Sequence, residues 1–350
     1  MNAQNYKKPT SNVNDPNYHY SVKGLFRSRF KDGYLVNIDY KSLEVFIASL
    51  VSKDPGMMQA LMDGADIHKR NASVAFDIPI DEVDPKHRQL AKAVTFGLMY
   101  GEGAQGLSDS RGLTLEEAEQ TIDKVMKAMP RIDRTNQLVQ HFAKTTGFVE
   151  TISGHVRRLP EAKSSDKRLQ SRAVRQSFNA VIQGSGSYCT NTALILIRKA
   201  FIRLGLKSKI AITVHDSVVI DIPKEEITKV PLLVKFIMEH LPIDEFILEA
   251  KDFPTLKIDP KYMIDDHRFR FPLFAEIEFG KTYADGLDYN IDEINALGID
   301  KYYQYGMEGK LVKDTYNTQL ASEDDEDKKK AIINKMNDKL DAIHKKYFGE

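Results

Sequence analysis

Residues 88–101 have the sequence RQLAKAVTFGLMYG, and this stretch decides how the rest of the chain is interpreted. Four of its side chains recur at intervals of four positions: Arg88, Lys92, Phe96 and Tyr100. An α-helix has 3.6 residues per turn, so this spacing places them on one slowly drifting face about 18 Å long. The face carries two cations, then a flat apolar ring, then a phenol. A nucleoside triphosphate offers phosphates, a sugar and a base in the matching order, and Arg and Lys bind phosphate oxygens.

An amphipathic surface helix with one buried aromatic ring would show the same spacing. Two details favour a functional helix instead. Val94 and Thr95 are mediocre helix formers, and Gly97 costs about 1 kcal/mol relative to Ala inside a helix. Local choices that oppose the local structure occur most often at functional sites. The stretch therefore predicts a helix that presents one face to a phosphate-bearing ligand.

The composition is that of a globular protein without a membrane segment. The length of 350 residues predicts two or three domains. A hydrophobic content of 42% and a charged content of 29% are typical of a globular protein. No apolar run approaches the ~20 residues that cross a membrane, and the start lacks a secretory apolar core. The single cysteine, Cys189, excludes an internal disulfide and a cysteine cluster for zinc. We expect a cytoplasmic protein with no membrane partner.

The charge is balanced overall but not locally. Fifty basic residues match fifty acidic ones, so the net charge gives no hint of a nucleic-acid partner. One short stretch is nevertheless strongly basic: Arg157, Arg158, Lys163, Lys167, Arg168, Arg172 and Arg175. A basic patch of this kind suits a phosphate backbone, although a solvated loop and helix face has the same composition.

The periodicity predicts strands at both ends of a mostly helical middle. Residues 34–39 form a strand after Gly33, and helical spacing begins just beyond Asp39. Residues 55–150 are predicted to be helical, with a capping box at 114–117. Two hairpins are predicted, at 149–159 and at 210–222, with a long helix over 168–204 that breaks near 183–186.

The C-terminal third is less regular. A helix over 229–240 is followed by residues 243–272, which lack a clear period and are interpreted as an insertion. Residues 274–279 alternate and predict a closing strand. The charge run at 323–330 is typical of a solvated tail or linker, and residues 331–347 predict a terminal helix.

Three motifs resemble those of family A DNA polymerases, the bacterial DNA polymerase I family. The pattern R-x-x-x-K-x-x-x-F-G-x-x-Y-G at 88–101 resembles their fingers-helix signature. VNIDYKSLEVFIASL at 36–50 resembles motif A, and AITVHDSVVID at 211–221 resembles motif C. The resemblance covers about residues 23–285, with the motifs in order. It implies an α+β fold of right-hand polymerase architecture, in which an antiparallel palm sheet accompanies a largely helical fingers subdomain.

The resemblance implies a two-metal site for nucleotidyl transfer. An Asp at a strand end is usually a cap or turn residue. In this family, however, the aspartates that match Asp39 and Asp216 lie on adjacent strands and hold two Mg²⁺ ions, and Tyr40 would add its backbone carbonyl. Carboxylate oxygens suit Mg²⁺, and such an ion pair can activate the primer 3′-hydroxyl and stabilise the leaving pyrophosphate.

The nucleotide site implied by the resemblance includes a D-I-H element at 66–68. His68 would join Arg88 and Lys92 around the β- and γ-phosphates, with Lys92 as a catalytic proton donor to pyrophosphate. Phe96 would stack near the sugar and base, and Phe rather than Tyr here implies weak termination by dideoxynucleotides. Glu44 would hydrogen-bond Tyr100 and block the 2′-position, which excludes ribonucleotides.

The resemblance also implies an interface for primer-template DNA. The hairpin with its arginine-rich end and the R-x-x-x-N-x-x-x-Q-G pattern supply most of it, together with the histidine of motif C. The residues concerned are Arg157, Arg158, Arg175, Asn179, Gln183 and His215. Amide side chains can hydrogen-bond minor-groove acceptors, which occur on every base pair, so this contact checks geometry without reading sequence.

Three substitutions depart from the family pattern. Ser42 replaces a common Gln, Phe46 stands where Arg is usual, and Ser217 replaces the Glu of H-D-E. H-D-S also occurs in single-subunit RNA polymerases, which leaves that activity as an alternative to DNA synthesis. A non-catalytic DNA-binding subunit is a second alternative. Glu44 and the F-G-x-x-Y-G run favour a DNA-directed DNA polymerase that uses dNTPs over RNA synthesis. The retained Asp39, Asp216, Arg88 and Lys92 favour an active enzyme over a DNA-binding subunit.

The fourth departure is that about 38 residues precede Asp39, too few for the thumb and exonuclease domains. Either a second polypeptide carries them, or this chain is one exon of a gene interrupted by an intron. We expect weak distributive synthesis by this chain alone and a role in viral DNA replication in a bacterial host. The expected division is 1–50 palm (N-terminal part), 51–174 fingers, 175–285 palm (C-terminal part, with the insertion around 243–272) and 286–350 charged C-terminal extension.

Overall fold

The computed structural model describes residues 10–16, 18, 20–100, 103–127 and 129–349, with the backbone alone for residues 98–100. The chain divides into two compact units. The sheet unit consists of Met1–Lys41, Thr190–Glu239 and Phe274–Glu350, and the helical unit of Ser42–Cys189 and His240–Leu273. Among the described residues, no helix is both long enough and apolar enough to span a bilayer.

The sheet unit contains a five-stranded antiparallel sheet in the order β4-β5-β1-β8-β9. Its strands are β1 (Tyr34–Tyr40), β4 (Lys209–Val214), β5 (Ser217–Ile222), β8 (Ala275–Gly280) and β9 (Leu287–Asp288). The central strand β1 buries Tyr34, Val36 and Ile38 completely, as expected for a strand that is flanked on both sides. The predicted antiparallel sheet and the hairpin at 210–222 are confirmed.

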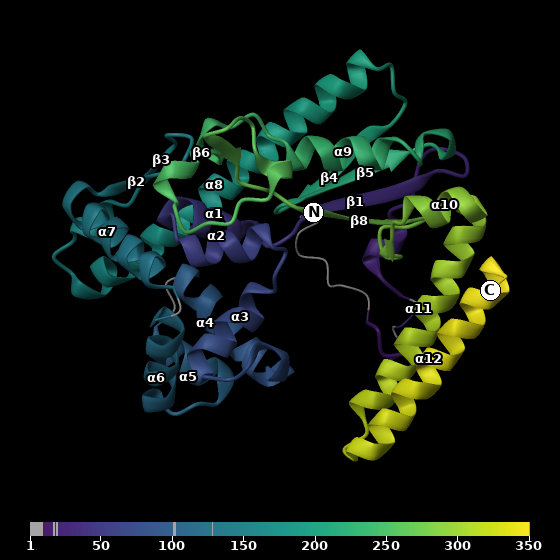
Figure 1. The fold of residues 1–350 in the computed structure, drawn as a ribbon, viewed down its shortest axis with the longest axis horizontal. Helices are drawn as coiled ribbons and strands as arrows, with labels where there is room; N and C mark the ends of the chain where they lie inside the picture. The colour runs from purple at the N-terminus through teal and green to yellow at the C-terminus, as the bar shows by residue number, and fades with distance from the viewer. Residues whose placement is uncertain (1–9, 17, 19, 101–102, 128, 350) are drawn as a thin grey trace. The chain divides into compact units, whose positions relative to one another are not determined.

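Helices complete the sheet unit: α9 (Val230–Glu239), α10 (Ile291–Leu297), α11 (Ile299–Ala321) and α12 (Glu326–Phe348). The terminal helix predicted at 331–347 is confirmed, and residues 323–325 of the charge run form the predicted linker between α11 and α12. Residues 326–330 begin α12, which lies antiparallel to α11 (Figure 1). Asp300 on α11 ties this pair to the sheet because it accepts a 2.6 Å hydrogen bond from the Tyr34 hydroxyl.

The helical unit begins with seven helices: α1 (Leu43–Ser52), α2 (Pro55–Met62), α3 (Ile67–Phe76), α4 (Pro85–Tyr100), α5 (Ala104–Arg111), α6 (Leu115–Lys127) and α7 (Pro130–Thr146). The hairpin of β2 (Phe148–Glu150) and β3 (Val156–Arg158) follows. The capping box is confirmed, since Thr114 Oγ1 accepts from Glu117 N and the Glu117 carboxylate accepts from Thr114 N.

The long helix α8 (Lys167–Arg203) runs without the break that the sequence predicted near residues 183–186. The two glycines in that stretch serve close packing instead. A Cβ on Gly184 would lie 2.6 Å from the Thr151 side chain, and one on Gly186 would lie 3.3 Å from Leu43. Small residues inside a helix therefore mark close neighbours here rather than a helix end.

The insertion forms a short antiparallel pair, β6 (Ile247–Glu249) and β7 (Arg268–Arg270), within the helical unit. The insertion also explains why position 46 on α1 is Phe and not the Arg that is usual in the family. The Phe46 ring stacks on Phe271 at 4.6 Å and meets Phe246 edge-on at 5.2 Å, and both partners come from the insertion. An arginine at position 46 would bury an unpaired charge in this aromatic cluster.

Candidate active site

The register of the sheet unit brings the two motif aspartates to the same place. Asp39 on β1 is paired with Ser217 on β5, and Asp216 directly precedes Ser217 in the tight turn after β4. His215 opens this turn with φ of 55°, a left-handed conformation that reverses the chain within two residues. Directly opposed residues in antiparallel strands lie about 4.5–5.5 Å apart, so Asp39 and Asp216 are close neighbours.

A third acidic residue, Glu276, lies in the same row and was missed by the sequence analysis. Asp39 is paired with Ser217 on one side and with Glu276 of β8 on the other. Opposed residues in antiparallel strands point to the same face of the sheet. The Glu276 carboxylate lies 3.2 Å from Lys41 Nζ, and both side chains are exposed. The alternation of residues 274–279 indicated the strand but not its partner.

The donor set of this acidic row (Asp39, Asp216 and Glu276) fits a hard divalent cation, because it consists of carboxylate oxygens. Burial raises the pKa of the neighbouring Tyr283 phenol, and the charges of Asp39 and Glu278 raise it further. The Tyr40 phenol donates to Met238 O over 3.0 Å. The Tyr40 side chain is thus occupied elsewhere and does not contribute its phenol to the row.

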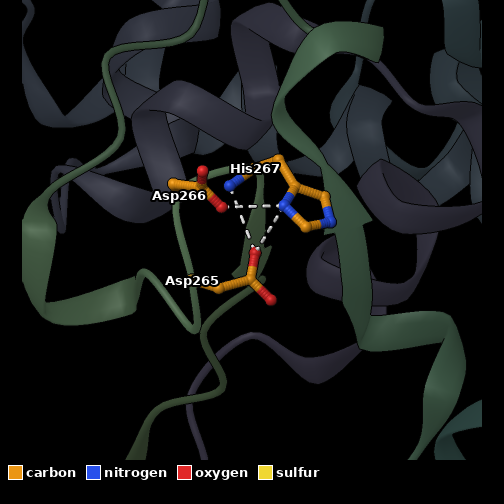
Figure 2. Close-up of side chains that lie close together, drawn as sticks. All are labelled: Asp265, Asp266 and His267. Carbon is orange, nitrogen blue, oxygen red and sulfur yellow. Dashed lines mark hydrogen bonds and ion pairs between the residues drawn. The ribbon is translucent and has the colours of Figure 1, made fainter.

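A second group of potential metal ligands lies in the insertion, where Asp265, Asp266 and His267 approach one another within 4.8 Å (Figure 2). Arg268 lies 2.5 Å from the Asp265 carboxylate and neutralises it. The Asp266 side chain is 95% exposed. Three consecutive surface residues that already bond to one another and to an arginine do not form a cation site, so we assign none there.

Helices α3 and α4 gather the expected phosphate-binding residues in the helical unit. Asp66 caps α3, accepting from the backbone N–H groups of His68 and Lys69 at 3.0 Å. Arg88 Nε donates to the other oxygen of Asp66 over 2.6 Å. The centre of the Phe96 ring lies 5.3 Å from that of His68 and 5.6 Å from Lys92 Nζ.

His68 is the most unusual of these residues. Its side chain is buried, with 6% of its surface exposed, and its Nδ1 atom has no hydrogen-bond partner within the described part of the chain. Burial, together with the charge of Lys92, lowers the pKa of the imidazole to about 4. The ring is therefore neutral at physiological pH, with a polar atom that lacks a partner.

Four predicted DNA-binding residues of the helical unit, Arg157, Arg158, Asn179 and Gln183, share one surface between β3 and α8. Arg157, Asn179 and Gln183 line a cavity of about 410 Å³. Arg157 and Arg158 also line a second cavity of about 390 Å³ with Arg172. Asn179 Oδ1 is buried and has no hydrogen-bond partner among the described residues. The surface thus combines cations with an amide oxygen for which the described residues offer no donor.

The remaining predicted residues are placed as follows. Arg175 is exposed on α8, four residues before Asn179, and lines neither cavity. Glu44 is half-buried in the first turn of α1, in the helical unit, whereas His215 belongs to the sheet unit. Tyr100 ends α4, but its side chain lies outside the described residues, so its hydrogen bond with Glu44 stays a prediction.

Comparisons with known proteins agree with this geometry. The family model described as DNA polymerase family A matches residues 6–284. The DNA polymerase of Bacillus phage SP01 is 35% identical over 320 residues, which is 89% of this chain and 33% of the relative. DNA polymerase I of Streptococcus pneumoniae is 34% identical over 220 residues, which is 63% of this chain and 25% of the relative.

A solved structure is similar as well. The POL domain of Pol1 from M. smegmatis, in complex with DNA primer-template and dNTP, superposes with a TM-score of 0.68 at 26% identity. The match covers 81% of this chain and 45% of that one. The chain spans a third or less of the length of the two curated relatives. The family model spans most of the sequence, and strand pairing brings the two motif aspartates of the chain, Asp39 and Asp216, close together. The chain therefore belongs to DNA polymerase family A.

Proposed function

We propose that this chain performs template-directed DNA synthesis, transferring a deoxynucleotide to a primer 3′-hydroxyl with release of pyrophosphate. The observation that carries the proposal is the pairing of Asp39 with Ser217, which makes Asp216 its neighbour. The phage SP01 relative is a DNA polymerase, and the similar POL domain binds primer-template and dNTP.

The acidic row is where Mg²⁺ would bind. Asp39 and Asp216 would hold two ions, with the backbone carbonyl of Tyr40 as a further ligand. When bound, such ions polarise the reacting oxygens and offset the charge that develops on the phosphates. The carboxylates themselves keep the site negative and exclude other anions until the metal-bound triphosphate arrives.

The helical unit would supply the nucleotide site. His68, Arg88 and Lys92 would bind the triphosphate, and Lys92 would donate a proton to the departing pyrophosphate. Phe96 would stack on the nucleotide, with the weak dideoxynucleotide termination that phenylalanine implies. Glu44 and Tyr100 would leave no room for a 2′-hydroxyl, so we expect Glu44→Ala to admit ribonucleotides.

DNA would lie along the surface of β3 and α8. The two arginines of β3 and Arg175 would bind phosphates, while Asn179 and Gln183 would donate to minor-groove acceptors of the primer-terminal pair. His215 would contact the primer terminus. We further propose that a second polypeptide supplies the thumb and exonuclease parts, and that the pair acts in the cytoplasm of a phage-infected bacterium.

Primer extension tests this proposal. The purified chain is incubated with a primer-template, Mg²⁺ and either deoxy- or ribonucleotides, beside Asp216→Ala as the matched control. We expect short, distributive products with deoxynucleotides and none from the variant. Equal extension by the variant would contradict the proposed site. Extension with ribonucleotides would favour RNA synthesis, and long processive products from the chain alone would contradict the need for a second polypeptide.

A further inference from the structure

Asp66 connects two parts of the proposed triphosphate site that come from different helices. One carboxylate oxygen caps α3 by accepting from the His68 and Lys69 N–H groups, both at 3.0 Å. The second oxygen accepts from Arg88 Nε on α4 at 2.6 Å. Partial burial raises the pKa of Asp66, but the hydrogen bonds from Arg88 and Lys69 outweigh it, so the pKa is lowered and the carboxylate is charged.

The Arg88 contact leaves the end of the guanidinium available. Asp66 engages Nε, so the two terminal nitrogens, which form the fork that suits phosphate oxygens, remain for a ligand. The Arg88 side chain is 40% exposed, and without a partner it would sample many rotamers. Fixing such a side chain before a ligand arrives removes part of the entropy cost of binding.

A separate observation indicates a ligand at this place. His68 follows Asp66 by two residues, and the α3 cap fixes its backbone. Its buried Nδ1 lacks a hydrogen-bond partner in the part of the chain that the structure describes, which is costly unless a ligand satisfies it. The same carboxylate thus holds the backbone of His68 and the guanidinium of Arg88.

We propose that Asp66 is a positioning residue that orients Arg88 and His68 for the triphosphate of the incoming nucleotide. It acts through these two residues and does not touch the ligand itself. This inference rests on the proposed function, because it assumes that the face formed by α3 and α4 binds a triphosphate. It adds the element that arranges the face before binding.

Asp66→Asn and Asp66→Ser separate the two roles of the carboxylate. Both side chains can still cap a helix, but neither offers the second carboxylate oxygen that Arg88 uses. Binding of dATP and of inorganic tripolyphosphate to the full chain is measured by calorimetry. We expect a roughly 3- to 10-fold increase in Kd for either variant, from the loss of preorganisation. In primer extension KM for dNTP should rise by the same factor with kcat nearly unchanged.

Asp325 provides the matched control. It caps α12 by accepting from Asp327 N and Lys328 N at 3.0 and 2.9 Å, in the same pattern as Asp66, and none of these bonds involves an arginine. Asp325→Asn should leave the Kd unchanged. In an Arg88→Ala background, Asp66→Asn should add less than a twofold effect if it acts through Arg88.

The outcomes are distinct. Weaker binding in both Asp66 variants, with an unchanged melting temperature and no added effect on Arg88→Ala, supports the inference. If Arg88→Ala weakens binding but both Asp66 variants bind like the original chain, the inference is overturned while the nucleotide site stands. Should the original chain bind neither dATP nor tripolyphosphate, the proposed site fails and the inference fails with it.

Discussion

The acidic row and the face of α3 and α4 are assembled in different ways. In the row, backbone pairing between strands places Asp39 opposite both Ser217 and Glu276. On the helices, side chains hold one another, as in the 2.6 Å bond from Arg88 to Asp66. A site held by backbone pairing should tolerate loss of a functional side chain without loss of stability. At a site held by side chains, removing one contacting side chain should weaken ligand binding even where that side chain does not touch the ligand.

The largest expected effect comes from the row. Asp216→Asn keeps the size of the side chain and the turn but removes the charge that would bind Mg²⁺. Metal stabilisation of the transition state is worth several kcal/mol, so kcat in primer extension should fall by about 10³-fold. The melting temperature should stay within about 1–2 °C, because the backbone holds the register. A large loss of stability would contradict the distinction between the two sites.

Phe46 in the helical unit should show the opposite response, a loss of stability, because its side chain packs in the core and takes no part in the proposed chemistry. The ring is 2% exposed and is held between Phe246 and Phe271. Phe46→Ala should lower the free energy of unfolding by about 3–5 kcal/mol, measured by urea titration. Phe142→Ala is the matched control, because that ring is 42% exposed in the same unit and should cost much less. Equal costs would mean that the insertion does not stabilise α1.

His68 makes the stability of the helical unit depend on pH. Its pKa is about 4 in the folded chain, against about 6.5 when exposed, because burial disfavours the charged ring. The unfolded chain therefore binds more protons between these values, and stability is full above pH 6.5 and falls as the pH drops towards 4. The expected loss approaches about 3 kcal/mol.

His68→Gln should flatten this pH dependence of unfolding, measured by urea titration at a series of pH values between 7 and 4. His155→Gln, at an exposed histidine of the same unit, is the matched control. An unchanged slope in His68→Gln would mean that the ring is not held neutral by burial. Added tripolyphosphate should reduce the slope in the original chain, because a bound anion favours the protonated ring.

Sequence patterns predicted what depends on local periodicity. The face of α4 follows from a four-residue spacing, and the end of β1 at Asp39 follows from a change of period. Strand pairing between distant segments was predicted only where the family resemblance supplied it, as for Asp39 and Asp216. The pairing of Asp39 with Glu276 joins residues far apart in the chain, and alternation within a strand does not reveal its neighbour.

The same limit explains the other differences. Gly184 indicated a helix break, but its lack of a side chain serves close contact with Thr151, which only the packed structure reveals. Phe46 was a departure without a reason until Phe246 and Phe271 of the insertion supplied its partners. The charged C-terminal stretch has the composition of a solvated segment, yet its half-buried aromatic side chains pack α12 on α11.

Glu276 should give the smallest effect, and it tests whether the row extends beyond the two motif aspartates. Ser217 cannot replace the charge of a glutamate, and its hydroxyl already donates to Val214 O over 2.9 Å. Glu276 faces Asp39 from the other side and pairs with Lys41 in an exposed ion pair that contributes little. Because water weakens the attraction between exposed charges even at short distance, Glu276→Gln should weaken Mn²⁺ binding by roughly 2- to 5-fold, measured by paramagnetic titration without DNA. Glu249→Gln, at an exposed glutamate of the insertion, should leave Mn²⁺ binding unchanged. If Glu276→Gln also leaves it unchanged, the metal site consists of the two motif aspartates without a third acid. In that case Ser217→Glu tests position 217: stronger Mn²⁺ binding by this variant would mean that a third acidic side chain acts from position 217 rather than from position 276.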